Sequence, residues 1–276
     1  MKYKLTEETK VVYGHTLHRI VCVTAFASVS VGDIGGWVEH ENNLSQEGDA
    51  WVCGNASVCD NASVYGNACV YGNACVYGNA SVCGNASVYG NASVYGDASV
   101  YGNACVCDNA SVYGDASVYG NASVYGNACV CDNAWVYGDA KVYGNASVCG
   151  NASVYGNASV YGDACVCDNA SVYGDASVYG NASVYGDAWV CGNAEVYGDA
   201  KVCVDADYIV LKNSWSSGRN FTYTASNKKW KVGCFYGTGE ELIAKAYKDS
   251  ELSGKCYEAS VKYVEEIERK KKEQKK

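Results

Sequence analysis

A six-residue unit, Ala-Ser-Val-Tyr-Gly-Asn, repeats from Ala50 to Asp205 without an insertion or a deletion. Valine occupies every sixth position from Val52 to Val202, and alanine stands two residues before each of these valines. A short repeat of constant length indicates identical structural units that stack on one another. The sequence therefore predicts a solenoid, and it constrains the shape of the molecule far more than its chemistry.

Each unit has the pattern of a short strand followed by a corner. Ala92 and Val94 are two residues apart, so in a strand they point to one side, while Ser93 and Tyr95 point to the other. The Gly-Asn or Gly-Asp pair that follows bends the chain, because these residues tolerate positive φ. A hairpin at every corner would alternate the faces of successive units, whereas a helical winding keeps every alanine and valine inside.

Three units per turn give an 18-residue triangular coil, and successive coils stack about 4.8 Å apart as parallel strands. Residues 50–205 supply about eight to nine coils, which make a shaft on the order of 40 Å long. Every corner position three residues after a valine is Asn or Asp, and stacked asparagines can form amide ladders between coils. A right-handed solenoid is the structural alternative, but the even six-residue period argues against it.

A solenoid has two open ends whose strand edges invite aggregation, so each end needs a cap. Before the repeats, residues 10–13 and 18–24 alternate in polarity as two strands around Gly14. The sequence thus predicts an all-β solenoid with a cap at each end. Its parts are a small N-terminal β cap (1–49), the repeat β-helix (50–205) and a C-terminal hairpin and helical cap (206–276).

The C-terminal cap is predicted to contain a β-hairpin and two helices. Residues 221–224 and 230–232 flank a polar turn. Thr238 and Glu241 have the spacing of a capping box at the start of the first helix, and the second helix is expected after Gly254. The second helix carries an apolar stripe, which we expect to pack on the hairpin. The stripe consists of Tyr257, Val261, Val264 and Ile267.

The repeats resemble the left-handed parallel β-helix of hexapeptide-repeat proteins, whose best-known members are acyltransferases. The segments GGWVE at 35–39 and NLSQ at 43–46 are similar to the head motif of uncharacterised bacterial and prophage proteins with such repeats. The segment GCFYGTGEE at 233–241 resembles a tail module of similar proteins. The resemblance implies a triangular left-handed coil and offers acetyl-CoA-dependent acyl transfer as one function.

Acyl transfer of the kind this resemblance implies needs a histidine as general base and a loop that leaves the coils to shape the donor pocket. His15, His18 and His40 all precede the first coil, and no loop interrupts the repeats. The sequence therefore favours a non-catalytic scaffold or binding rod that uses no cofactor. A hexapeptide-type acyltransferase and a glycan- or partner-binding module are the alternatives.

The repeats are acidic, with 12 carboxylates and two lysines between residues 50 and 204 in a chain of net charge −9. Nucleic-acid binding needs a basic footprint, so nucleic acid is not an expected partner. No apolar run reaches membrane-spanning length, and the charged start around Lys2 and Lys4 is unlike a signal peptide. We expect a cytoplasmic protein that does not contact a membrane.

Fourteen of the 17 cysteines occupy outward positions in the repeats. Stacking by 18 residues gathers five of them on one wall, about 4.8 Å apart between coils and about 6.6 Å apart along a strand. Thiolates favour soft metals, but parallel strand positions do not converge as tetrahedral zinc requires. Chance replacement of Tyr or Ser is the alternative explanation. The five residues of this thiol patch are Cys129, Cys131, Cys149, Cys165 and Cys167.

Seventeen tyrosines occupy the outward position after a valine and align in rows on successive coils. One row is Tyr125, Tyr143, Tyr161, Tyr179 and Tyr197. A second row is Tyr101, Tyr119, Tyr137, Tyr155 and Tyr173, with Trp135 and Trp189 on the same face. The rows either stiffen the shaft, by roughly 0.2–1 kcal/mol per aromatic pair, or form a contact surface. As a contact surface, we expect the second row to join copies into a homo-oligomer, such as a trimer, or to bind a glycan or another protein.

Overall fold

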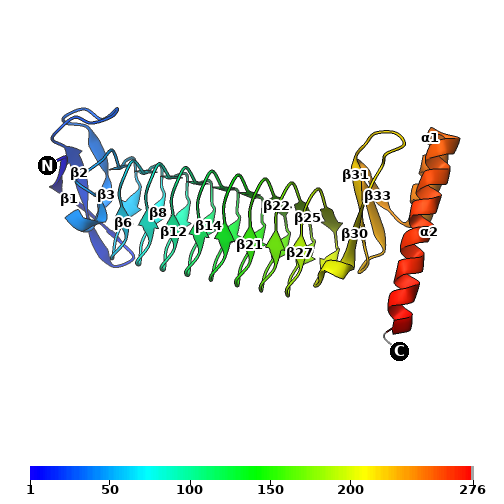
Figure 1. Cartoon of the computed structure of the whole chain (residues 1–276). Helices are drawn as coiled ribbons and strands as arrows, with labels where there is room; N and C mark the ends of the chain where they lie inside the picture. Colours follow the sequence, from blue (N-terminus) through cyan, green and yellow to red (C-terminus); the bar gives the residue numbers. More distant parts are fainter. Residues whose placement is uncertain (275–276) are drawn as a thin grey trace.

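The computed structural model describes residues 1–274 and forms a rod with a cap at each end (Figure 1). Residues 275 and 276 of the predicted C-terminal cap lie outside this range. Twenty-six short strands, β4 (Trp51–Val52) to β29 (Lys201–Val202), make up the shaft, and each contains one repeat valine. All have two residues except β22 (Ser159–Gly162), β25 (Ser177–Gly180) and β28 (Glu195–Gly198). The predicted solenoid of 18-residue coils is confirmed.

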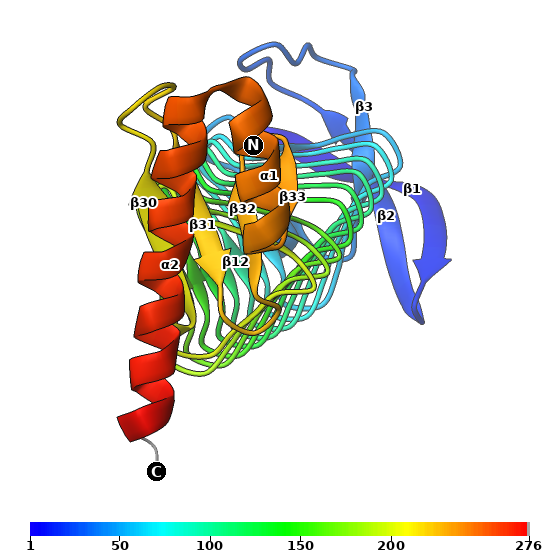
Figure 2. The ribbon, with the colours of Figure 1, turned by 90° about the vertical axis from the view of Figure 1, so that its right-hand side faces the viewer.

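The strands form three parallel sheets, which are the three walls of the shaft. Wall 1 runs from β5 (Ser57–Val58) to β29, wall 2 from β4 to β28, and wall 3 from β6 (Ser63–Val64) to β27 (Trp189–Val190). Each wall has eight or nine shaft strands, so the chain completes about nine turns. Paired residues are 18 apart in every wall, and the coils therefore follow one behind another with the same outline when the rod is viewed from its end (Figure 2).

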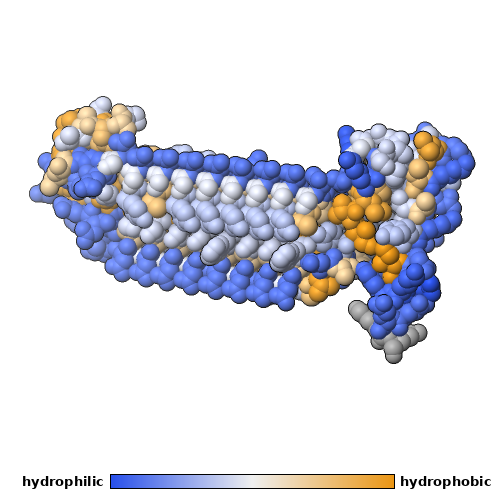
Figure 3. All heavy atoms as spheres, in the orientation of Figure 1, coloured by the Kyte–Doolittle hydropathy of each residue, from blue (hydrophilic) through white to orange (hydrophobic). Residues whose placement is uncertain are grey.

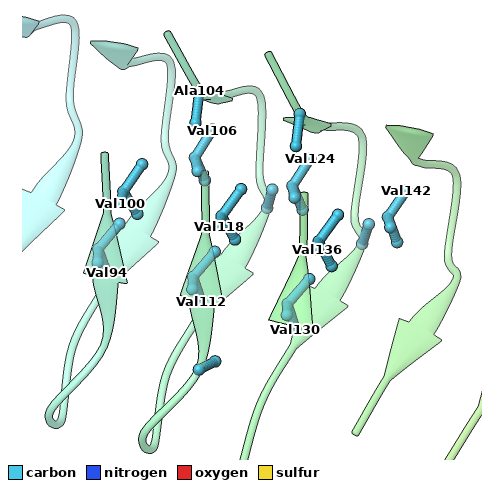
Figure 4. Packing of buried hydrophobic residues seen from close by; sticks show 14 of the residues in the cluster. Val94, Val100, Ala104, Val106, Val112, Val118, Val124, Val130, Val136 and Val142 are labelled. Atoms are coloured by element: carbon cyan, nitrogen blue, oxygen red, sulfur yellow. The ribbon is translucent and has the colours of Figure 1, made fainter. Parts of the chain in front are cut away.

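Valine and alanine fill the interior of the shaft, as the alternation within each unit predicts. Every repeat valine from Val52 to Val202 is fully buried, and no repeat alanine is more than 1% exposed. Valines of the three walls, such as Val112, Val118 and Val124, point into the same interior (Figure 4). Because this interior is narrow and lined by small side chains, every larger side chain of the coils lies on the outside.

The residues at the corners must accept a positive φ, and they must also allow the backbone of the next coil to lie close by. Gly84 has φ +67°, and a Cβ on it would lie 2.9 Å from the backbone nitrogen of Gly102. At four corners, aspartate replaces glycine with φ 56–60°, a conformation that aspartate adopts more readily than most residues. Each of these carboxylates accepts a hydrogen bond from a glycine N–H one coil later. The four are Asp60, Asp108, Asp132 and Asp168.

Asparagines at the corners form the predicted ladders between coils. At the corner between walls 2 and 1, an unbroken series of side-chain hydrogen bonds runs from Asn55 to Asp163. Each asparagine amide donates to the Oδ1 atom one coil later, at 2.8–3.3 Å. The series ends at Asp163, because a carboxylate accepts hydrogen bonds but cannot donate one onward. The ladders hold the coils in register at the surface, as the valines do inside.

The N-terminal cap is a three-stranded extension of wall 1. β1 (Tyr3–Val12) and β2 (His15–Cys22) form an antiparallel hairpin, and β3 (Ile34–Val38) pairs with both β2 and β5. The first strand is longer than the predicted range 10–13, because its pairing with β2 already begins at Tyr3. The short helix η1 (Glu41–Asn43) then leads into the first coil.

Side chains of both caps bond to the backbone at the open edges of the shaft. At the first coil, the Lys2 ammonium donates to Ala50 O at 2.7 Å, and the Asn43 amide donates to Ala62 O at 2.8 Å. At the last coil, N–H groups that have no further coil to bond donate to side-chain oxygens instead. These pairs are Trp189 with Asp205, Glu195 with Thr222, Lys201 with Ser226 and Cys203 with Asp207. The caps thus satisfy backbone groups that would otherwise be unpaired.

The C-terminal cap has a sheet and a hydrophobic core of its own. After η2 (Asp205–Asp207), an antiparallel sheet packs against two helices, and Thr238 and Glu241 form the predicted capping box. The predicted hairpin is the middle pair of the sheet, and the two outer strands were not predicted. In order, the elements are β30 (Tyr208–Lys212), β31 (Asn220–Thr224), β32 (Lys229–Val232), β33 (Phe235–Gly237), α1 (Gly239–Asp249) and α2 (Glu251–Gln274).

The second helix begins at Glu251, before Gly254 rather than after it. Gly254 is buried against the Tyr247 ring of α1, so its lack of a side chain serves the close approach of the two helices. The predicted stripe packs on the sheet through Tyr257, Val261 and Val264, whereas Ile267 is half-buried. Within residues 1–274, neither helix combines the length and the apolar character that crossing a membrane requires.

Candidate functional site: the aromatic wall

The five tyrosines of the second predicted row lie on wall 3 and stack along the shaft. Successive ring centroids are 4.8–4.9 Å apart, and the rings are inclined to each other by 0–5°. The backbone imposes this distance, since it is the spacing of the coils. Because each ring covers the faces of its neighbours, the row presents ring edges and hydroxyl groups outward. The row consists of Tyr101, Tyr119, Tyr137, Tyr155 and Tyr173.

Trp135 and Trp189 lie beside this row but outside the stack. Their rings make angles of 73° and 76° with Tyr119 and Tyr173, and the two residues are 51% and 55% exposed. Val204 is exposed at the last corner, next to the C-terminal cap. At the outward strand positions of the shaft, by contrast, the large apolar residues that are exposed all belong to wall 3. They are Tyr65, Tyr101, Trp135 and Trp189. We call wall 3 with these residues and the tyrosine row the aromatic wall.

The character of the aromatic wall differs from that of the caps. On the face shown in Figure 3, strongly hydrophobic residues gather at the two ends of the rod, whereas most of the shaft is pale or hydrophilic. The outward strand positions of the aromatic wall hold only Ser, Tyr, Cys and Trp, with no charged side chain. The wall is therefore a surface of amphipathic rings between uncharged hydroxyl groups, and aliphatic side chains take no part in it.

The other predicted row, Tyr125 to Tyr197, lies on wall 2 at centroid distances of 4.5–4.8 Å, with its rings stacked up to Tyr179 and the last pair tilted by 36°. The C-terminal cap covers the end of this row. The Lys231 ammonium lies 5.5 Å from the centre of the Tyr197 ring, and Tyr236 packs edge-on against the same ring at 4.6 Å. This row is thus partly an internal contact between shaft and cap, and it is a natural comparison for the aromatic wall.

The thiol patch predicted on one wall comes together in part, on wall 1. The sulfur atoms of Cys149, Cys165 and Cys167 all lie within 4.8 Å of one another, and Cys131 Sγ lies within the same distance of Cys149 Sγ. Cys129 is on the same wall but in neither of these groups. Burial raises the pKa of Cys149 to about 12 and that of Cys167 to about 11, so both are protonated thiols at neutral pH.

A cluster that the sequence analysis missed joins the N-terminal hairpin to the first coil. His15 places Nδ1 3.1 Å from Glu39 Oε1 and Nε2 3.1 Å from Asp60 Oδ1. Asp60 also donates its N–H to the Glu39 carboxylate at 2.8 Å. A carboxylate at each ring nitrogen favours the imidazolium form, and the hydrogen bond with Glu39 raises the pKa of His15. The only sequence signal was the aspartate in a glycine position at residue 60.

The groups that face the ring nitrogens of the three histidines decide whether a histidine is available as a general base. Both ring nitrogens of His15 face carboxylates, as described above. His18 Nδ1 lies 3.2 Å from Thr6 O, and His40 Nε2 lies 3.7 Å from Glu39 Oε1. All three histidines are in the N-terminal cap, and none lies on a strand of the shaft.

The stability of the N-terminal cap is expected to fall as His15 loses its proton. The folded-state pKa is raised above 6.5, so the stabilisation is fully present below pH 6.5 and is lost as the pH rises through the folded-state pKa. Thermal unfolding measured between about pH 6 and pH 9 should show this loss in the wild type and a flatter profile in His15→Gln. The groups facing His15 are Glu39 and Asp60, with His40 beyond Glu39. A His40→Gln control should keep the wild-type slope, and an unchanged slope in His15→Gln would contradict the prediction.

The architecture defines the class of the protein as a β-solenoid of stacked 18-residue coils, capped by antiparallel strands and by a sheet with two helices. Comparison with models of known protein families and with curated proteins gave no match. The hexapeptide-repeat resemblance therefore stays a prediction.

Proposed function

We propose that the protein is a non-catalytic scaffold, a rigid rod that associates with further copies of itself through the aromatic wall. The observation that carries this proposal is that, at the outward strand positions of the shaft, the exposed large apolar residues are confined to wall 3. A group of exposed apolar side chains on an otherwise polar surface marks an interaction site. Since no loop leaves the coils between residues 50 and 205, the wall offers an extended and even contact face.

A second copy of the shaft suits this wall better than a sugar or a charged partner. The tyrosine ring faces are already covered by one another, which leaves their edges and hydroxyl groups for packing and hydrogen bonding. The strand positions of two such walls would bring no like charges together, because they are uncharged. Both copies also have the same coil spacing, so the ridges of one row can fit between the ridges of the other.

A glycan-binding module and an acyltransferase are the competing functions. For a glycan, the indole rings of Trp135 and Trp189 are the candidate platforms, because they are more than half exposed and lie outside the tyrosine stack. For acyl transfer, a histidine would have to act as general base, but His15 is held between two carboxylates. Each of these functions would use only a small part of the regular surface.

Replacing Tyr137, Tyr155 and Tyr173 together with serine is expected to dissociate the oligomer. Aromatic residues at the centre of an interface carry most of its affinity, so the triple change should weaken association by more than about 100-fold. Serine already occupies outward positions of this wall, and the backbone should tolerate it. Sedimentation velocity over a series of protein concentrations measures the mass.

The matched control replaces Tyr125, Tyr143 and Tyr161, which stack in the same way on wall 2. The control should lower the melting temperature and leave the mass unchanged, because it loses ring contacts within one shaft only. A wild-type protein that stays monomeric at high concentration would refute self-association. Turnover of acetyl-CoA that is lost in His15→Ala would support the acyltransferase instead.

A further inference from the structure

We propose that wall 1 carries a binding site for a soft metal ion, with Cys149, Cys165 and Cys167 as ligands and Cu(I) as the ion. Two neighbouring coils supply these residues. Cys165 and Cys167 flank the inward Val166, and Cys149 stands 18 residues before Cys167 in the same position of the repeat. The three sulfur atoms lie within 4.8 Å of one another, and no other three cysteines of the described chain are grouped this closely.

The distances fit a three-coordinate ion. Metal–sulfur bonds of about 2.3 Å place three sulfurs about 4 Å apart when the ion lies in their plane. Sulfurs that are already within 4.8 Å of one another reach this arrangement by small side-chain rotations. Tetrahedral zinc would need a fourth ligand above the wall, whereas thiolates alone are a suitable ligand set for Cu(I).

The surroundings of the three thiols favour a cation. Asp132 and Asp168 occupy corners next to the thiol patch, and one Asp132 oxygen lies within 4.8 Å of Cys149 Sγ. The three cysteines are half-buried, so an ion can reach them from solvent. Binding would displace one proton from each thiol to solvent, and three thiolates with one Cu(I) would leave the site with a charge of −2. Affinity should therefore rise with pH.

The test is a titration of the fully reduced protein with Cu(I), without oxygen and in competition with bicinchoninate. We expect one tightly bound ion per chain, and X-ray absorption should show three sulfur ligands at about 2.3 Å. The variant Cys149→Ser/Cys167→Ser should bind more than about 100-fold more weakly, because loss of supporting groups around ligands alone costs 10–100-fold. Cys149 and Cys167 point outward and are half-buried, and serine exchanges only the sulfur atom for an oxygen, so the variant should keep the fold, which circular dichroism verifies.

The control is Cys105→Ser/Cys107→Ser on wall 2, which also removes two thiols and which takes them from a pair with the spacing of Cys165 and Cys167. The neighbouring coils place Ser87 and Ser123 opposite Cys105, so this pair lacks a third thiol there. The control should keep the wild-type affinity for Cu(I). Equal losses in the two variants would mean that copper binds the cysteines without preference, and would overturn the proposal. Nitrogen or oxygen ligands in the absorption spectrum, or tighter binding of Zn(II) than of Cu(I), would overturn it as well.

Discussion

Replacing Val136 with aspartate is expected to lower the free energy of unfolding by at least about 3 kcal/mol. Val136 is fully buried and pairs with Val118 and Val154 of the adjoining coils. A carboxylate at this position would lose its hydration, and the alanine and valine side chains around it offer no hydrogen bond in return. Denaturant unfolding followed by circular dichroism measures the change.

The control for this substitution is Ser153→Asp, one coil further along the same wall. Ser153 points outward, so the same new charge should change the free energy of unfolding by less than about 0.5 kcal/mol. The comparison separates the effect of burial from the effect of one more negative charge on an acidic shaft. Similar losses at the two sites would contradict the assignment of inward and outward positions.

Removing residues 210–276 is expected to make the protein aggregate as its concentration rises. The truncation takes away the Thr222 and Ser226 hydroxyl groups, which accept hydrogen bonds from the N–H groups of Glu195 and Lys201. It also removes Val210, which packs against the hydrophobic core of the shaft. Exposed strand edges readily pair with other chains, so light scattering should increase steeply with concentration.

The double variant Thr222→Val/Ser226→Ala provides the comparison, because it removes the same two acceptors while the cap stays in place. It should be less stable by roughly 1–3 kcal/mol for each N–H left without a partner, and it should not aggregate. If the truncated protein remains monodisperse at high concentration, residues 210–276 are not required as a cap. Their sheet and helices would then serve a separate purpose.

The shaft could be predicted from the sequence because each unit has the same surroundings as the next. The burial of Val136 and the stacking of Tyr137 on Tyr155 follow from counting in steps of six and eighteen. The caps have no such period. The outer strands β30 and β33 are defined by pairing with β31 and β32, and the cluster of His15, Glu39 and Asp60 by the way a hairpin folds back on a coil.

At the candidate sites, too, the repeat predicts where a residue lies but not how its side chain is arranged. The period places Trp135 on wall 3, but its exposure and its angle to Tyr119 depend on a side-chain conformation that the period does not set. Likewise, counting by 18 gathers five thiols on wall 1, whereas side-chain rotation brings three sulfurs within 4.8 Å of one another. Position on a wall is thus predictable, and the fine geometry of a site is not.

The equal spacing of the coils has a consequence for how such a rod can change in length. Inserting or removing 18 residues would leave every wall, ladder and cap contact in place, and would move the two caps apart or together by about 4.8 Å. Inserting or removing six residues would instead transfer every later side chain to the next wall and interrupt the rows of rings and amides at that point. The distance between the two caps can therefore vary in steps of one whole coil, while the arrangement of side chains on each wall is preserved.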